Sequence, residues 1–409
     1  MSTHEMATPA RGSAMPQDAP PASRSAWLVQ LGSAALSRGT AMPAVASLLV
    51  IAVFFQLQSP HFLSPLNLSN LAVQATLIAV IALGEVIVLL LGEIDLSLGS
   101  ICGATAAILG VLMTSGNLPW YVAVPGMVLA GALMGAFQGW WIAWLGIPSF
   151  VVTLAGMLAF LGLQLFILGP NGTMSVFDPT IAGLTGSWVP VELGTILGIG
   201  VALAVAVVVI RSVSSGRRDL RHLAFPIVIA ALVIGGLAVF NSAKGIPVAF
   251  LALVLMLLLG WWVTQHTTAG RHLFAVGGNA EAARRAGISV VRMRFAAFTL
   301  SGAIAAIGGV FAVSYNGSAG TLTGGGTLLL EAIGAAVIGG TSLFGGRGTV
   351  WSALFGALIM GGVANGLDLT NADQPVKYMV QGAIVLLAVS MDTILRRRQS
   401  RGRLGGIRA

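Results

Sequence analysis

The sequence has few charged residues, and this scarcity excludes an ordinary soluble protein. Asp, Glu, Lys and Arg make up 8% of its 409 residues, whereas a soluble domain is about one-quarter charged. Hydrophobic residues make up 56%, and the mean hydropathy is +0.92. The apolar runs are continuous and do not alternate with polar residues, which argues against a transmembrane β-barrel. The composition therefore predicts an all-α polytopic membrane protein.

Cysteine and lysine are also scarce. The single cysteine, Cys102, excludes a disulfide within the chain, and its place in an apolar run predicts a packing role. The two lysines, Lys244 and Lys377, do not fit the G-x-x-x-x-G-K-[ST] phosphate loop. We therefore expect no ATP site, catalytic residue or metal site in this chain.

Basic residues exceed acidic ones and give a net charge of +8. No basic patch is interleaved with aromatic residues, so we expect no nucleic-acid partner. In a membrane protein, basic residues mark cytoplasmic loops instead. The 54 glycines favour close packing of helices in the lipid bilayer.

The apolar runs predict twelve membrane spans, or ten if a pair is removed or one run is re-entrant, because a helix needs roughly 20 residues to cross the bilayer. Before them, residues 1–42 predict a disordered cytoplasmic tail, and residues 395–409 predict a basic cytoplasmic tail. The transmembrane domain between them covers residues 43–394. The spans cover about 43–58, 68–91, 96–114, 119–145, 147–168, 191–210, 224–241, 246–264, 295–313, 327–345, 348–367 and 376–394.

The distribution of basic residues supports this topology. With both termini in the cytoplasm and twelve crossings, all Lys and Arg residues except Lys244 and Lys377 fall on the inside, which is 19 of 21. Bacterial membrane proteins show this asymmetry. Adding or removing one span between the basic segments would destroy it, so the loop at 265–294 is predicted to be cytoplasmic.

This cytoplasmic loop contains the stretch GRHLFAVGGNAEAARRAGI (270–288). Asn279 predicts a helix N-cap, and Gly287 predicts its end. Glu281 in the first turn and Arg285 four residues later match the helix dipole and form a favourable pair. A helix of about seven residues is too short to be stable alone, so neighbouring spans or a partner must hold it.

The segment EAARRAGI (281–288) resembles the EAA-type coupling loop of ABC importer permeases. In that family a short helix inserts into a cleft of the ATP-hydrolysing subunit. The resemblance implies a coupling role for Asn279, Glu281, Ala282, Ala283, Arg285 and Gly287. It also implies an ABC ATPase subunit that binds ATP and Mg, a periplasmic sugar-binding protein, and a permease homodimer in the bacterial inner membrane.

Two further stretches resemble sugar permeases of the ribose/xylose/arabinose branch: LLLGEIDLSLGS (89–100) and the Gly-rich region 331–367. Each has an apolar span, a break and a second span, which hints at an internal repeat and makes both breaks candidates to line a cavity. Residues 185–245 form an insertion relative to the shorter ribose-type permeases. A longer permease with this extra helical pair resembles the xylose-type subgroup. The resemblance therefore implies import of a monosaccharide, with a pentose such as xylose favoured.

Polar side chains within the apolar runs either connect helices or face a path. The candidates for a substrate path are Gln74, Glu85, Glu93, Asp95, Gln164 and Asn365, and Gln138, Glu331 and Gln381 have the same character. Asp95 has a second interpretation as a cap for the span that follows it, and the role of Glu93 stays open, since many relatives have glycine there.

The fourth span carries Gly131, Gly135 and Gly139, a small-xxx-small pattern for packing within the chain or for a dimer face. An ion-coupled secondary transporter of a small neutral solute is the alternative function. Such a transporter would require charge pairs inside the membrane, and Glu85 alone gives only weak evidence for them. A channel or a purely structural protein gives no reason for the coupling-type loop.

Overall fold

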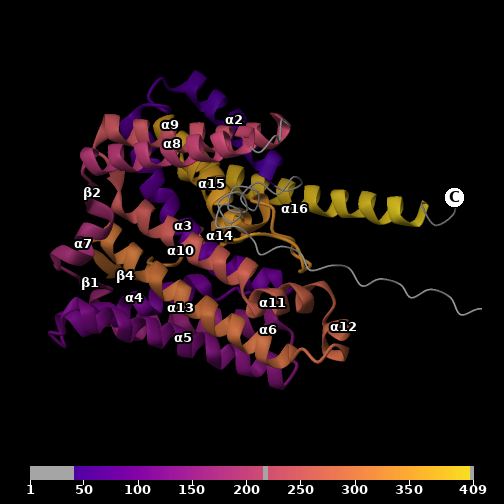
Figure 1. The fold of residues 1–409 in the computed structure, drawn as a ribbon. Coiled ribbons are helices and arrows are strands. Elements are labelled where there is room, and N and C mark those ends of the chain that lie inside the picture. The colour runs from indigo at the N-terminus through magenta and orange to yellow at the C-terminus, as the bar shows by residue number, and fades with distance from the viewer. Residues whose placement is uncertain (1–40, 215–219, 406–409) are drawn as a thin grey trace, which may run out of the picture.

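The computed structural model describes residues 41–214 and 220–405, which form a bundle of helices with two short two-stranded sheets (Figure 1). The predicted disordered tail lies outside the described residues, except for its last two positions. Those two positions begin α2.

The helices are α2 (Ala41–Gln58), α3 (Pro65–Leu90), α4 (Leu98–Thr114), α5 (Trp120–Trp144), α6 (Ser149–Leu168), α7 (Pro179–Gly186), α8 (Val191–Ser214), α9 (Leu220–Ala243), α10 (Val248–His266), α11 (Thr268–Gly278), α12 (Ala280–Arg285), α13 (Val290–Asn316), α14 (Leu328–Ile338), α15 (Trp351–Leu369) and α16 (Gln374–Gly405). A 3-10 turn covers Gly169–Asn171. The strands are β1 (Thr173–Ser175), β2 (Trp188–Val189), β3 (Ile246–Pro247) and β4 (Ser318–Gly320).

The predicted all-α polytopic fold is confirmed. Among the described residues, 6 helices are long and apolar enough to cross a membrane: α3, α5, α6 with the turn that follows it, α10, α13 and α15. Shorter apolar helices cover 44–58, 98–114, 191–207, 233–243 and 328–338, and match five other predicted runs. The total of ten to twelve spans stays a prediction.

The run predicted as a span at 327–345 is not one continuous helix. Helix α14 has 11 residues, a length of about 16 Å, against a hydrocarbon core of about 30 Å. Residues 339–350 are non-helical, and Gly340 and Gly348 have φ angles of +108° and +146°. Glycine alone adopts such angles readily. An apolar run long enough to span can therefore be interrupted by its glycines, which hydropathy does not register.

Two small sheets join loops at one end of the bundle, called here the outer end. Strand β1 pairs with β4, with Met174 opposite Ala319, and β2 pairs with β3, with Trp188 opposite Pro247. These strands lie in or beside segments that the topology predicts to be outside. Figure 1 shows β1, β2, β4 and α7 together on the left of the bundle.

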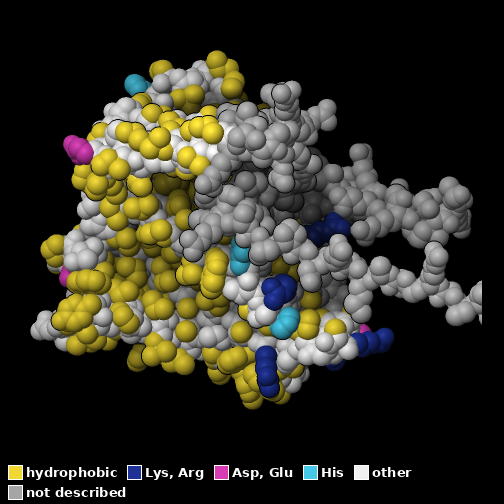
Figure 2. Space-filling view, viewed as in Figure 1, with side chains coloured by type: hydrophobic (Ala, Val, Ile, Leu, Met, Phe, Trp, Pro, Cys, Tyr) yellow, Lys and Arg dark blue, Asp and Glu magenta, His cyan; other side chains and the backbone are white. Residues whose placement is uncertain are grey.

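Three segments predicted to be inside, 92–95, 265–294 and 346–347, meet at the opposite end, called here the inner end. The N–H of Gly346 donates to the Leu90 carbonyl at 3.0 Å, and Arg294 forms an ion pair with Glu93 at 2.8 Å. Figure 1 places α11 and α12 on the right, and Figure 2 shows Lys and Arg side chains gathered on that same side. Among the described residues, these inside segments and the outside segments that carry the strands thus lie at opposite ends of the bundle, as the topology requires.

The glycine pattern of α5 packs within the chain, against α13. A Cβ at Gly131 would lie 2.6 Å from the Cβ of Ala306, and one at Gly135 would overlap the Phe298 carbonyl. The two helix backbones therefore lie in close contact, which the absence of a Cβ at these glycines allows. Of the two interpretations of this pattern, intrachain packing is correct, and a dimer would have to use another face.

We expect Gly135→Ala to destabilise the purified protein by about 1–3 kcal/mol, because the new methyl group forces α5 away from α13. The matched control is Gly162→Ala in α6, where a Cβ would meet no atom within 4 Å. Thermal unfolding in detergent measures both variants. Equal melting temperatures for the two would contradict the close packing.

Candidate coupling and transport sites

The predicted short helix is present as α12. The Asn279 side chain accepts a hydrogen bond from the N–H of Ala282 at 3.0 Å, as the cap predicts. The helix covers 6 residues, where about seven were expected, and Gly287 follows it with a φ of +81°. A residue with a Cβ is strained at that angle, so glycine allows the chain to turn toward α13.

The charges on α12 contact one another and remain exposed. Glu281 pairs with Arg284 at 2.9 Å and with Arg285 at 3.3 Å. Their side chains are 58%, 64% and 80% exposed, so these pairs add little stability. The pair predicted four residues apart is confirmed, and the three charged groups stay accessible to another protein.

Helix α12 is fixed to the bundle by a small apolar side chain. Ala283 is 5% exposed and belongs to the main hydrophobic cluster, whereas Ala282 is exposed.

The preceding helix α11 was not predicted, because Gly270 and the pair at 277–278 break the pattern of a helix. Two weak signals were available: the Thr267 side chain caps α11 by accepting from Gly270 N–H at 3.2 Å, and apolar residues three apart occupy its buried face.

Asp95 lies in the break between α3 and α4 and bonds to Ser97, the N-cap residue of α4, without accepting from the first helical turn itself. Its carboxylate accepts from the N–H and the hydroxyl of Ser97 at 2.9 and 2.6 Å, and from the Ser301 hydroxyl at 3.3 Å. The Ser97 hydroxyl also bonds to Gln138 of α5. Asp95 is completely buried, so this network fixes the junction of α4, α5 and α13.

The other two acidic candidates have different surroundings. Glu93 is 13% exposed in the ion pair with Arg294 at the start of α13. Glu85 is completely buried on α3, its carboxyl group approaches the backbone of Asp95, and neither of its oxygens has a hydrogen bond of normal geometry with a described residue. A buried carboxyl group without such bonds lowers stability.

A cavity of about 280 Å³ lies in the outer half of the bundle. This volume is near the lower end of the range for small-molecule sites, which is about 300–1,000 Å³. Polar groups are distributed around an apolar wall, and they come from α3, α7, α13, α14 and α15. The lining residues are Val73, Gln74, Leu77, Ile78, Thr185, Phe311, Tyr315, Leu328, Glu331, Gly361, Ala364 and Asp368.

Hydrogen bonds hold the polar wall of this cavity in place. The amide of Asn365 donates to Gln74 at 3.4 Å and to Asn67 at 3.1 Å. Glu331 accepts from Thr327 at 2.6 Å and from Gln381 at 3.0 Å. Both clusters tie together helices that surround the cavity, and they position Gln74 and Glu331 on its surface.

Asp368 lines the cavity at the end of α15 and forms an ion pair with Lys377 of α16. This pair explains one of the two basic residues that the topology places outside. The other, Lys244, lies 4.6 Å above the ring of Trp188, beside the β2–β3 sheet. Both cations are therefore held by partners at the outer end.

Of the six predicted path residues, Gln74 lines this cavity, and Asn365 donates a hydrogen bond to Gln74. Gln164 lies elsewhere: its amide donates to the carbonyls of Gly320 and Thr323 at 2.8 and 3.0 Å and holds the outer loop before α14. The two breaks do not line the cavity either. Sequence reasoning missed Thr185, Tyr315 and Asp368, which lie at the C-terminal ends of α7, α13 and α15, beyond the predicted apolar spans.

Residues 67–389 match the model of a family described as branched-chain amino acid transport system / permease component. The chain belongs to this family. It is 37% identical over 368 residues to the xylose transport system permease protein of Escherichia coli, across 87% of this chain and 92% of that protein.

Two other relatives extend the comparison. The xylose transport system permease protein of Haemophilus influenzae is 32% identical over 359 residues, across 84% of this chain and 93% of that protein. The D-allose transport system permease protein of Escherichia coli is 28% identical over 271 residues, across 66% of each. No solved structure matches the chain.

The family match and the similarity to these permeases identify the protein as a multi-pass permease of the ABC importer type, as the coupling-loop resemblance implies. The secondary-transporter alternative is therefore set aside.

We expect two buried polar residues to respond in opposite ways to replacement by methionine. Glu85→Met removes a carboxyl group without hydrogen bonds and should preserve or raise stability, by about 1 kcal/mol. Gln138→Met removes one of the two side-chain partners of the Ser97 hydroxyl and leaves only Asp95, so it should lower stability by about 1–3 kcal/mol. Thermal unfolding of the purified protein measures both. A large loss for Glu85→Met would show that its carboxyl group binds a partner.

Proposed function

We propose that this permease imports a pentose such as xylose across the bacterial inner membrane, and that a separate ATPase subunit binds ATP and Mg²⁺ and drives it. The observation that carries the substrate is the similarity to a xylose permease over 92% of that protein's length. The likeness to a D-allose permease is weaker and covers 66% of each chain.

The chemistry of the cavity supports a small neutral sugar. Gln74 offers both amide donors and an acceptor, while Glu331 and Asp368 offer acceptors for hydroxyl groups. Tyr315 and Phe311 add aromatic surface, against which an apolar sugar face can lie. A few hydrogen bonds in a mainly apolar cavity bind weakly enough for release, which a transporter requires.

The inner end supports the ATPase partner. Helix α12 is short, its exposed side chains include the small Ala282 next to Glu281, and its charges bond only weakly to one another. A narrow helix of this kind fits a groove on another protein, and the Asn279 cap and Gly287 set its length. These residues, with Ala283 and Arg285, form the proposed coupling site.

Further partners complete the proposed transporter. The outer end, with segments 169–190 and 314–326, is the face on which a periplasmic sugar-binding protein would dock. The cavity described above lies within one chain. In the proposed transporter two permease copies are needed to form a central path, and this chain would supply one half. The α5 glycines are covered by α13, so the dimer contact would use other exposed apolar helix faces.

The test is uptake of labelled xylose by inner-membrane vesicles that contain the permease, its ATPase and its binding protein. We expect depletion of ATP, with the proton gradient intact, to abolish uptake. We expect Glu281→Lys, or Gly287→Asp, to reduce uptake about tenfold or more while membrane insertion stays normal, because each disturbs the face that contacts the ATPase.

The conservative change Glu281→Gln is the graded control, and it should reduce uptake less than charge reversal does. Copurification of the ATPase separates lost docking from misfolding. Loss of uptake on collapse of the proton gradient, with ATP present, would support a secondary transporter. Normal uptake by a well-expressed Glu281→Lys/Gly287→Asp double variant would contradict the coupling site.

A further inference from the structure

Three glycine-containing segments meet backbone to backbone at the inner end. They are the end of α3 with its following turn (Leu90–Gly92), the end of α11 at Gly277, and residues 344–346 of the break between α14 and α15. We call this contact the glycine joint. The Leu90 carbonyl lies at its centre and accepts the N–H of Gly346 at 3.0 Å. This carbonyl is one of the last four of α3, which have no partner within the helix.

Side chains are excluded from the glycine joint on all three sides. A Cβ at Gly277 would overlap the Leu90 carbonyl oxygen and lie 2.8 Å from the Gly346 nitrogen. A Cβ at Gly345 would lie 2.7 Å from both the Gly277 oxygen and the Gly92 nitrogen. Gly92, Gly345 and Gly346 also have φ angles of +79°, +80° and +71°, which a side chain would strain.

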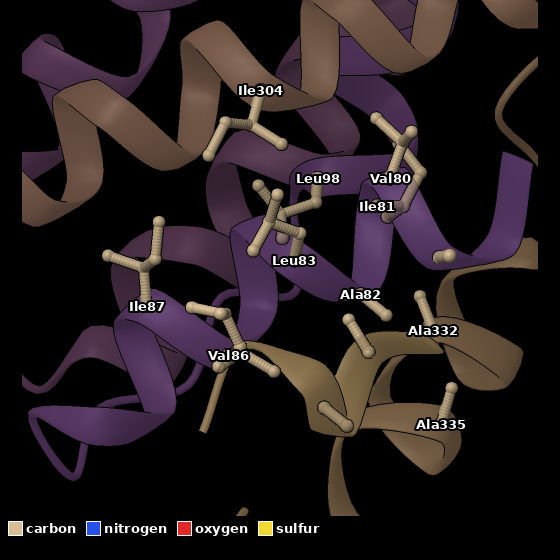
Figure 3. Packing of buried hydrophobic residues seen from close by; sticks show 14 of the residues in the cluster. Val80, Ile81, Ala82, Leu83, Val86, Ile87, Leu98, Ile304, Ala332 and Ala335 are labelled. Atoms are coloured by element: carbon tan, nitrogen blue, oxygen red, sulfur yellow. The ribbon is translucent and has the colours of Figure 1, made fainter. Parts of the chain in front are cut away.

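The glycine joint lies at the inner ends of three of the helices that line the cavity, α3, α14 and α15. Helix α3 contributes Gln74 and Ile78 to the cavity lining, and the break joins α14 and α15, which contribute Glu331 and Asp368. Four and eight residues beyond Ile78, on the same face of α3, Ala82 and Val86 are completely buried. Figure 3 shows Ala82 close to Ala332 of α14. Between the cavity and the inner end, α3 and α14 therefore pack closely through side chains such as Ala82 and Ala332, and the glycine joint lies beyond them.

We propose that the glycine joint is the inner seal of the transport path and that α11 is the lever that opens it. This inference rests on the proposed function, in which the ATPase moves α12 and hence α11. Contacts between backbones contain no rotatable side chains that could absorb a displacement. Movement of Gly277 therefore acts directly on the Leu90–Gly346 bond, and separates α3 from the break between α14 and α15.

Adjacent glycines of α11 provide a matched pair of variants. Gly277→Ala places a methyl group against the Leu90 carbonyl, whereas a Cβ at Gly278 would meet no atom within 4 Å. Neither position has a positive φ, so both changes suit a helix equally. A reporter cysteine at Ala82, in a Cys102→Ala background, measures the seal by its reaction with a membrane-impermeant maleimide added from the cytoplasmic side without nucleotide.

We expect Gly277→Ala to increase the labelling rate of the cysteine at position 82 about tenfold relative to Gly278→Ala, and to reduce ATP-driven uptake by a similar factor. Copurification of the ATPase should be the same for both variants, which separates the seal from docking. Thermal unfolding shows whether a variant is misfolded. If Gly277→Ala does not fold, Gly345→Ala disturbs the glycine joint from another segment, and we expect the same increase in labelling.

The failures of the two proposals are distinguishable. Equal labelling and equal uptake for folded Gly277→Ala and Gly278→Ala would overturn the seal while leaving ATP-driven import intact. If uptake by the unaltered protein did not require ATP, the proposed function would fail. The labelling comparison would then still test the seal, because it uses neither ATP nor sugar.

Discussion

Close approach of backbones at glycine residues is the constraint on which the rest of the structure depends. In lipid, helices gain little from burying apolar side chains against each other, so tight contact of backbones and dispersion forces must hold them together. Helix α5 meets α13 in this way through Gly131 and Gly135. The inner end depends on the same device, where Gly277 and Gly345 bring three segments around the Leu90 carbonyl.

This constraint also explains where polar groups are tolerated. Irregular backbone at membrane depth survives where protein satisfies its hydrogen bonds. The break after α3 is held by Asp95, which bonds to Ser97 and Ser301, and the break after α14 is held by the Gly346–Leu90 bond. The cavity lies beyond these closed junctions, on the outer side. The described conformation therefore has its accessible polar wall toward the outer end and its packed seal toward the inner end.

The sequence allowed the grouping of several loops at two ends of the bundle and the short helix α12 to be predicted, because both depend on local chemistry. Charge asymmetry fixes which loops share a side, and Asn279, Glu281 and Gly287 each have a local role that the structure confirms. The half-length of α14 was not predictable from hydropathy, since its interruption depends on glycine conformation. The cavity was only partly predictable: whether a polar residue such as Gln74 or Gln164 faces it depends on helix rotation and packing.

The central claim is that α12 lies at the cytoplasmic end of the bundle and binds a separate ATPase. The most direct measurement is maleimide labelling of Ala282→Cys, an exposed position on α12, in sealed vesicles of known orientation. The account predicts that the cysteine reacts from the cytoplasmic side alone and that bound ATPase protects it. Reaction from the periplasmic side, or labelling that the ATPase leaves unchanged, would contradict it.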